Sequence, residues 1–295
     1  MDSERSFEQK VMKERPLEER VESIYQRACA QHEELTKIPP EALRSTITQM
    51  LTEVDMFECV ARENRASFEV SPEVAHEIGA IWVFSGPGTY DQPVKDDAYK
   101  KYPWARNMDR LRLDYAARIA RNVTAAITGT KITASPDTIS EAKRATKEAI
   151  RESGPSVFYN GTMVENESVR TALEQENGIM PVEKVFITPH PVRNTLEQVR
   201  DFVLPGEALS NGKTVAIVSH APHLSRVLRM LNRFKPLPED STVLLFPMPT
   251  PDDGKEEYAA TEITAIMYYA YVSGEGATPE PYPYKLYQSQ PHSSH

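Results

Sequence analysis

The segment TVAIVSHAPHLSRVLRML, residues 214–231, changes character halfway along its length. Its first part is an apolar, largely β-branched run, as is typical of a strand that is buried on both faces. Its second part spaces apolar residues as one face of an amphipathic helix does. Polar side chains lie where the strand passes into the helix: Ser219, His220, His223 and Arg226. The segment therefore predicts a strand–helix unit with functional groups at its junction.

The same alternation continues through the chain from Gly79 on. Strands are predicted in residues 79–86, 156–161, 183–189, 213–219 and 241–249, and residues 262–273 are a further candidate. Helices are predicted in residues 103–127, 137–154, 166–178, 194–204 and 222–234. Short strands that alternate with helices indicate crossover units and a mostly parallel sheet.

We therefore expect a three-layer, doubly wound, Rossmann-like α/β domain over residues 76–273. Residues 1–75 carry apolar stripes at helical spacing and no convincing strand, which predicts an N-terminal helical extension. These wide stripes also make self-association through the extension a candidate role. Residues 274–295 are rich in Pro, Tyr and Ser, and we expect a loosely docked tail.

Composition excludes several classes of protein. The 295 residues carry a formal net charge of -9, which disfavours nucleic-acid binding. No apolar run reaches the length of a membrane span, and the N-terminus lacks the apolar core of a signal peptide, so we expect a cytoplasmic protein. The two cysteines, Cys29 and Cys59, have no metal-site or redox spacing, and we expect them to be buried free thiols.

Ligands bind at the carboxyl ends of the strands in an open parallel sheet, so the residues after each strand are the candidates for a site. After the first strand, Ser85, Gly86 and Gly88 form either a phosphate-binding loop or a tight turn. After the second, Asn160 and Gly161 precede Glu167. We expect that glutamate to face the cleft or only to complement its helix dipole.

The third and fourth strands are followed by further polar groups. Asn194 or Thr195 is expected to cap a helix whose first turn holds Glu197. The fourth strand leads to the junction at residues 219–226. The candidate cations at these strand ends suit an anionic ligand such as a phosphate ester: Arg110, Arg193, His220, His223 and Arg226.

The order of these motifs resembles the ElyC/SanA/YdcF family of bacterial proteins over roughly residues 79 to 250. SGPG corresponds to the family's first loop, and MDRLRLDYAARIA offers Arg110 as its helix arginine. NES, VRNTLEQ and SHAPHLSR match the later motifs through these residues: Glu167, Asn194, Thr195, Glu197, Ser219, His223 and Arg226. The sequence departs from the family pattern at Val192, Gln198 and Asn166. The resemblance implies a divergent cytosolic member that binds a nucleotide-like ligand or acts in envelope metabolism.

Two functions fit these residues. The first is hydrolysis of a phosphoester or pyrophosphate. Arg226, Arg110 and the amides of residues 85–88 would hold the phosphoryl group, with His223 as general acid or base and Glu167 or Glu197 orienting it. No nucleophile motif is present, so water would attack. His220 and His223 offer at most two metal ligands, and no cofactor is indicated. The alternative is a non-catalytic nucleotide or S-adenosylmethionine binding module, in which Trp82 and Tyr159 either flank a base or pack in the core.

Overall fold

The computed structural model describes residues 15–66, 68–86, 108–129, 139–174, 180–209, 212–252, 254–274 and 276–289. Its described strands form one sheet in the order β3-β2-β1-β4-β5-β6, and every neighbouring pair runs parallel. Their bounds are Ile78–Phe84 (β1), Ser156–Asn160 (β2), Val185–Ile187 (β3), Thr214–His220 (β4), Thr242–Met248 (β5) and Lys285–Leu286 (β6). This order is that of the doubly wound Rossmann sheet, so the predicted fold class is confirmed.

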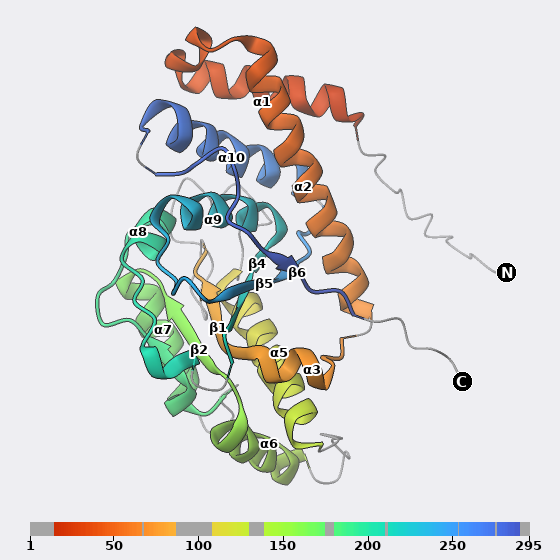
Figure 1. Ribbon diagram of the computed structural model, residues 1–295, viewed down its shortest axis with the longest axis vertical. Coiled ribbons are helices and arrows are strands. Elements are labelled where there is room, and N and C mark those ends of the chain that lie inside the picture. Colours follow the sequence, from red (N-terminus) through yellow and green to blue (C-terminus); the bar gives the residue numbers. More distant parts are fainter. Residues whose placement is uncertain are drawn as a thin grey trace, which may run out of the picture.

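Helices cover both faces of the sheet, and a further layer of helices lies beyond one of them (Figure 1). The main helices are α1 (Leu17–Gln31), α2 (Pro40–Ala66), α3 (Pro72–Glu77), α5 (Met108–Thr128), α6 (Ile139–Ser153), α7 (Met163–Glu174), α8 (Thr195–Arg200), α9 (Ala221–Phe234) and α10 (Lys255–Met267). Short 3-10 turns span Glu33–Lys37, Val182–Lys184 and Gly206–Leu209, and the π-helical turn Tyr268–Val272 follows α10.

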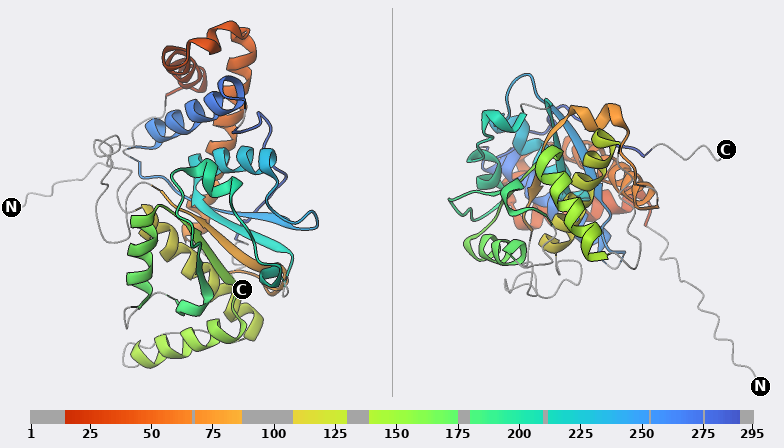
Figure 2. Two further views of the ribbon diagram at one scale, coloured as in Figure 1. Left: turned by 90° about the vertical axis from the view of Figure 1, so that its left-hand side faces the viewer. Right: turned by 90° about the horizontal axis from the view of Figure 1, so that it is seen from below.

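The central strands β1 and β4 are buried along their whole length. Alternate side chains of each strand enter two different apolar cores. Ile81 and Val83 contact α3 and α5 on one face, whereas Trp82 packs with α8 and α9 on the other. The two halves of Figure 2 show these helices on opposite sides of the strands. Burial on both faces explains why these strands read as continuous apolar runs in the sequence.

The N-terminal helices add a layer outside α9, as the predicted extension required. The apolar stripes of α1 and α2 face α10 of the same chain, where Ile24, Ile47 and Ile263 share a third core. α2 continues past α10 to pack along α9 and β5 (Figure 1). The stripes that made self-association a candidate role are thus buried inside the chain.

Two expectations about the C-terminal region are wrong. Residues 262–273 form the end of α10 and a π-helical turn instead of a strand, because their apolar side chains pack at helical spacing against α1 and α2. Residues 276–289 are not loose, since they add β6 to the sheet and stack Tyr287 on Phe246, with ring centroids 4.6 Å apart.

Two smaller findings complete the fold. Cys59 is exposed and donates to Glu63, in contrast to the expected burial, and Cys29 is half-buried. No helix in the described ranges combines the length and the apolar composition that a membrane span requires.

Candidate functional site

Polar side chains gather at the carboxyl ends of β1 and β4, the two central strands. Ser85 directly follows β1, and Ser219 and His220 end β4. The strand order reverses between β1 and β4, which is where ligands bind in open parallel sheets. We call the buried and half-buried polar side chains around this point the switch-point cluster: Ser85, Asp109, Arg112, Glu165, Thr195, Gln198, Ser219, His220, His223, Arg226, Tyr258 and Glu262.

The His223 imidazole lies between two hydroxyl groups. Its Nδ1 is 2.8 Å from Ser219 Oγ and its Nε2 is 3.0 Å from Thr195 Oγ1. Burial, and then the nearby guanidinium groups of Arg112 and Arg226, hold the pKa of His223 well below its usual range. The ring is therefore neutral at physiological pH, with one nitrogen that donates and one that accepts. A neutral imidazole suits a general base and does not attract an anion.

His220 is neutral for the same reasons. Burial and the charge of Arg112 lower the pKa of His220 well below its usual range. Its Nδ1 accepts a hydrogen bond from Arg112 Nε at 3.2 Å, which leaves the ring proton on Nε2. The two histidines expected to be cations at this junction are thus uncharged.

Arg112, and not the predicted Arg110, is the α5 arginine of the switch-point cluster. Its guanidinium is fully buried and donates to the carbonyls of Phe84 and Ser85 and to the Tyr258 hydroxyl. The Arg110 side chain is 60% exposed and lies 3.8 Å from Asp114. A helical pattern places residues 110 and 112 on different faces, and only residue 112 lies on the apolar stripe of α5.

Glu165, and not the predicted Glu167, is the α7 carboxylate near the cluster. Glu165 Oε2 accepts from the backbone N–H of Thr162 at 2.7 Å, and Thr162 Oγ1 accepts from the N–H of Glu165 at 3.3 Å. This reciprocal pair is a capping box, so the helix begins before the predicted start at residue 166. Burial raises the pKa of Glu165. The side chain of Glu167 is 75% exposed and lies 3.8 Å from Arg170.

Asn194 caps α8 as predicted, and its Oδ1 accepts from the N–H of Glu197 at 3.0 Å. The carboxylate of Glu197 does not reach His223. It accepts from the backbone N–H and the Nε of Arg193, both at 2.8 Å, and these bonds lower the pKa of Glu197. Thr195, the first residue of the helix, is the one that contacts the imidazole.

The remaining strand-end residues mainly hold the backbone. The Gly86 N–H donates to Asp109 Oδ1 at 2.7 Å, and the Gly161 N–H donates to Asn166 Oδ1 at 2.9 Å. Asn160 Oδ1 accepts from the Thr188 hydroxyl at 2.6 Å. Gly88 lies outside the described residues. Gly86 and Gly161 thus stabilise turns, and their amides already have partners.

α10 contributes two residues to the cluster that the sequence analysis missed. Glu262 pairs with Arg226, with Oε2 2.7 Å from the guanidinium Nε. Burial raises the pKa of Glu262, and Arg226 opposes that shift. The Tyr258 hydroxyl accepts from Arg112 Nη2 at 3.1 Å. The expected strand in residues 262–273 begins at Glu262, and no helix was expected over Tyr258, so neither residue was a candidate.

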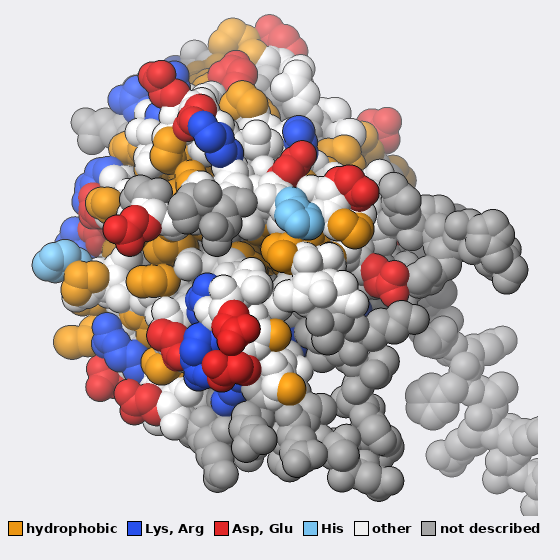
Figure 3. Space-filling view, turned by 60° about the horizontal axis from the view of Figure 1, so that its bottom comes forward, with side chains coloured by type: hydrophobic (Ala, Val, Ile, Leu, Met, Phe, Trp, Pro, Cys, Tyr) orange, Lys and Arg blue, Asp and Glu red, His pale blue; other side chains and the backbone are white. Residues whose placement is uncertain are grey.

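The positive end of α9 lacks the acidic side chains that lie at the N-termini of its neighbours. Acidic side chains occupy the first turns of α5, α7, α8 and α10. Among the described main-sheet helices, α9 alone has neither an acidic residue in its first turn nor a side-chain cap. A helix N-terminus of this kind favours negative charge. On the face shown in Figure 3, acidic and basic side chains are interspersed, so no broad basic surface competes there.

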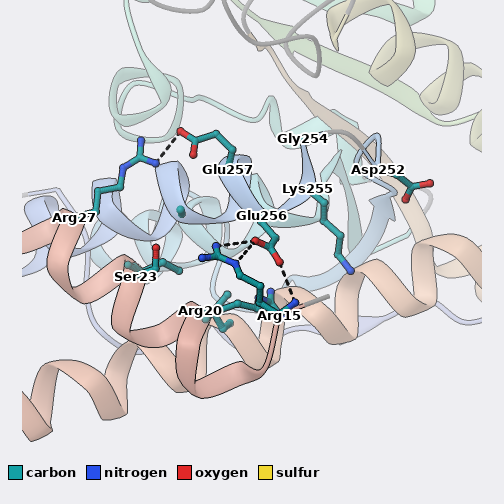
Figure 4. Close-up of a pocket in the computed structure, with 12 residues that line it drawn as sticks. Arg15, Arg20, Ser23, Arg27, Asp252, Gly254, Lys255, Glu256 and Glu257 are labelled. Atoms are coloured by element: carbon teal, nitrogen blue, oxygen red, sulfur yellow. Dashed lines mark hydrogen bonds and ion pairs between the residues drawn. The ribbon is translucent and has the colours of Figure 1, made fainter. Parts of the chain in front are cut away.

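A surface pocket lies elsewhere, between α1 and α10 (Figure 4). Its charged residues pair across the two helices: Arg27 donates to Glu257 at 2.8 Å and Arg15 to Glu256 at 2.8 Å. These pairs largely neutralise the pocket and hold α1 on α10. We therefore build the site on the switch-point cluster, where the buried imidazole is.

Comparisons with protein-family models, curated proteins and solved structures find no match to this chain. The resemblance to the ElyC/SanA/YdcF family therefore stays a prediction. Of its motif residues, the fold brings Thr195, Ser219, His223 and Arg226 into one cluster. In the described ranges, no three histidine, cysteine or acidic side chains come together as metal ligands do.

The two histidines link stability to pH. Their folded pKa values lie below the unfolded value near 6.5, so the unfolded chain binds more protons as the pH falls past that point. The free energy of unfolding then drops by up to about 1.4 kcal/mol per pH unit for each histidine. We expect His220→Gln to lose stability less steeply than the wild type in urea titrations between about pH 6.5 and 5.5.

The buried carboxyl groups act in the opposite sense. Burial raises the folded pKa values of Glu165 and Glu262, so their contribution falls as the pH rises above their unfolded pKa. The wild type and His220→Gln both contain these carboxyl groups, so the effect of the carboxyl groups cancels in the difference between the two titrations. Identical slopes for wild type and variant would show that the pKa of His220 is the same in the folded and unfolded states.

Proposed function

We propose that this chain binds a small, phosphate-containing anion at the junction of β4 and α9 and hydrolyses its phosphoester or pyrophosphate bond. The observation that carries this proposal is the neutral, buried imidazole of His223 at the positive end of α9. A general base of this kind lies where a doubly wound sheet binds its ligand. Arg226, one turn along the same helix, supports the binding of phosphoryl oxygens there.

The charge of the switch-point cluster favours the binding of an anion. This preference is weaker than the predicted set of cations would give, because His220 and His223 are neutral. Arg112 and Arg226 supply the positive charges, and Glu262 offsets one of them. Burial raises the pKa of Asp109 well above its usual range, which weakens the repulsion that this carboxyl group would exert on a phosphate. The dipole of α9 adds a partial positive charge at the N-terminus of the helix, and this charge comes from the backbone and not from a side chain.

The strand order favours a second candidate. Sheets of the order β3-β2-β1-β4-β5-β6 commonly hold dinucleotides or related cofactors without themselves reacting with them. The alternative is therefore a non-catalytic nucleotide or S-adenosylmethionine binding module that uses the same cluster.

One experiment separates the two candidates. The full chain is incubated with nucleotides, sugar phosphates and pyrophosphates, with and without divalent metal, and phosphate release is followed. We expect release to fall about 100-fold or more in His223→Ala and Arg226→Ala. Arg110→Ala and Glu167→Gln are the matched controls, because both residues are exposed, and they should leave release unchanged.

The outcomes are distinct. Thermal stabilisation by a nucleotide or S-adenosylmethionine without phosphate release would favour the binding module. Release that survives His223→Ala would remove the imidazole from the reaction. Thermal melting of each variant shows whether a loss of release reflects a loss of folding instead.

A further inference from the structure

The hydroxyl groups on either side of His223 are not equivalent. Ser219 lies at the end of β4 and is 0% exposed, His223 is 2% exposed, and Thr195 is 7% exposed. The three groups thus form a chain that runs from the core outwards, with Thr195 at its outer end. Of the two hydroxyls, that of Thr195 belongs to the less deeply buried residue.

The hydrogen bonds of this chain allow Thr195 to be activated. If Nδ1–H donates to Ser219 Oγ, then Nε2 carries a lone pair and accepts from the Thr195 hydroxyl. An imidazole that donates to one buried hydroxyl and accepts from a second has the hydrogen-bond arrangement of a base beside a nucleophile. The 3.0 Å separation of Thr195 Oγ1 and Nε2 is within reach for proton transfer.

α8 is held so that Thr195 stays at this position. The helix follows β3, which is separated from β4 by two other strands. Gln198 of α8 donates to the Ser85 hydroxyl at the end of β1. Phe202, just after the helix, stacks on Trp82 of β1 with ring centroids 3.6 Å apart. These two contacts hold α8 against β1, beside the switch point of the sheet.

We infer that Thr195 is the nucleophile of the proposed hydrolysis and carries the phosphoryl group in a covalent intermediate. This inference rests on the proposed function. Thr195 Oγ1 attacks phosphorus, its proton moves to His223 Nε2, and the bond from phosphorus to the leaving oxygen breaks. The leaving oxygen takes that proton. Water then attacks the phosphothreonine and gives a proton through Nε2 to Thr195 Oγ1, which releases inorganic phosphate and restores the free hydroxyl.

The test uses the full chain and the phosphate compound that it hydrolyses fastest. Turnover is stopped with acid, under which a phosphothreonine survives, and the peptide that contains Thr195 is examined by mass spectrometry. We expect one phosphoryl group on Thr195. Thr195→Val keeps the shape of the side chain without its hydroxyl, and we expect it to lower phosphate release about 100-fold or more. Thr195→Ser should retain both release and the label.

Two controls address folding and the role of Ser219. Thr188→Val removes a hydroxyl that bonds to Asn160, outside the chain of His223, and should leave release unchanged. Ser219→Ala removes the hydroxyl that lies 2.8 Å from His223 Nδ1 and orients the ring, so it should slow release while the label still forms on Thr195. Thermal melting confirms that each variant is folded.

The failures of the two proposals differ. If the wild type releases phosphate but Thr195→Val does so equally well, or if the label is absent or lies on Ser219, the inference is overturned and hydrolysis by His223 stands. If no compound of the set is hydrolysed by the wild type, the proposed function is overturned and the inference with it.

Discussion

Replacing Arg112 by methionine is expected to lower the free energy of unfolding by about 4 kcal/mol or more, because several buried acceptors lose their donor at once. The guanidinium is 0% exposed and donates to the carbonyls of Phe84 and Ser85, to His220 Nδ1 and to the Tyr258 hydroxyl. For a chain of this size the loss corresponds to a drop in Tm of roughly 10 °C. Urea titration and thermal melting measure it.

Arg110→Ala is the matched control on the same helix. Its side chain is 60% exposed, and we expect a change within about 0.5 kcal/mol. A second readout tests the electrostatic role of Arg112. Its charge lowers the pKa of His220 and of His223, so both should titrate at higher pH in Arg112→Met, as NMR can follow. Equal stability of the two variants would mean that Arg112 is not needed as a hydrogen-bond donor to the buried acceptors at the carboxyl ends of β1 and β4.

Glu53→Ala is expected to destabilise the chain by about 3–5 kcal/mol, because it leaves the buried Arg229 without its carboxylate. The Glu53 and Arg229 side chains are 10% and 4% exposed and lie 2.6 Å apart. Glu53 also accepts from the Ser225 hydroxyl at 2.7 Å, so one carboxylate joins α2 to two residues of α9. Urea titration gives the loss.

A double variant separates the buried charge from the packing. In Glu53→Leu with Arg229→Met no charge is left unpaired, and we expect much of the stability to return. Glu22→Ala removes an exposed partner of Arg44 and should leave the midpoint unchanged. A loss in the double variant as large as in Glu53→Ala would show that packing, and not the unpaired charge, is responsible.

Much of the fold is present in local patterns. Strands such as residues 213–219 are buried on both faces, so their apolar runs are unambiguous, and their alternation with helices implies the parallel sheet. Local patterns fail to predict the secondary structure of a segment where packing between elements distant in the sequence determines it. Residues 262–273 are rich in β-branched and aromatic side chains. They are nevertheless helical and π-helical, because α1 and α2 pack against the apolar side of α10 and bury it.

Within the site, sequence spacing indicated which side chains lie together where one short segment holds the interacting groups. Ser219 and His223 are four residues apart and hydrogen-bonded, and Asn194 caps its own helix. The wrong choices at residues 110 and 167 had signals in the sequence. The apolar stripe of α5 includes residue 112, and the pair Thr162 and Glu165 marks a capping box.

Other parts of the site carry no local signal. Arg112 bonds to His220 across 108 residues of sequence and to Tyr258 across 146. No spacing rule connects such partners, because the packing of the whole sheet brings them together. The neutral state of the histidines is equally a property of the fold, since it arises from burial and from arginines on other elements.

The closing of the sheet by β6 has a consequence for synthesis on the ribosome. Asn64 of α2 donates to the carbonyl of Tyr287, which lies 223 residues further along the chain. At translation rates of about 5–20 residues per second, α2 waits for tens of seconds before that carbonyl emerges. β5 is made only near the end of this interval, about 37 residues before β6, so its outer edge lacks a neighbour for a few seconds, during which the nascent chain exposes an open strand edge.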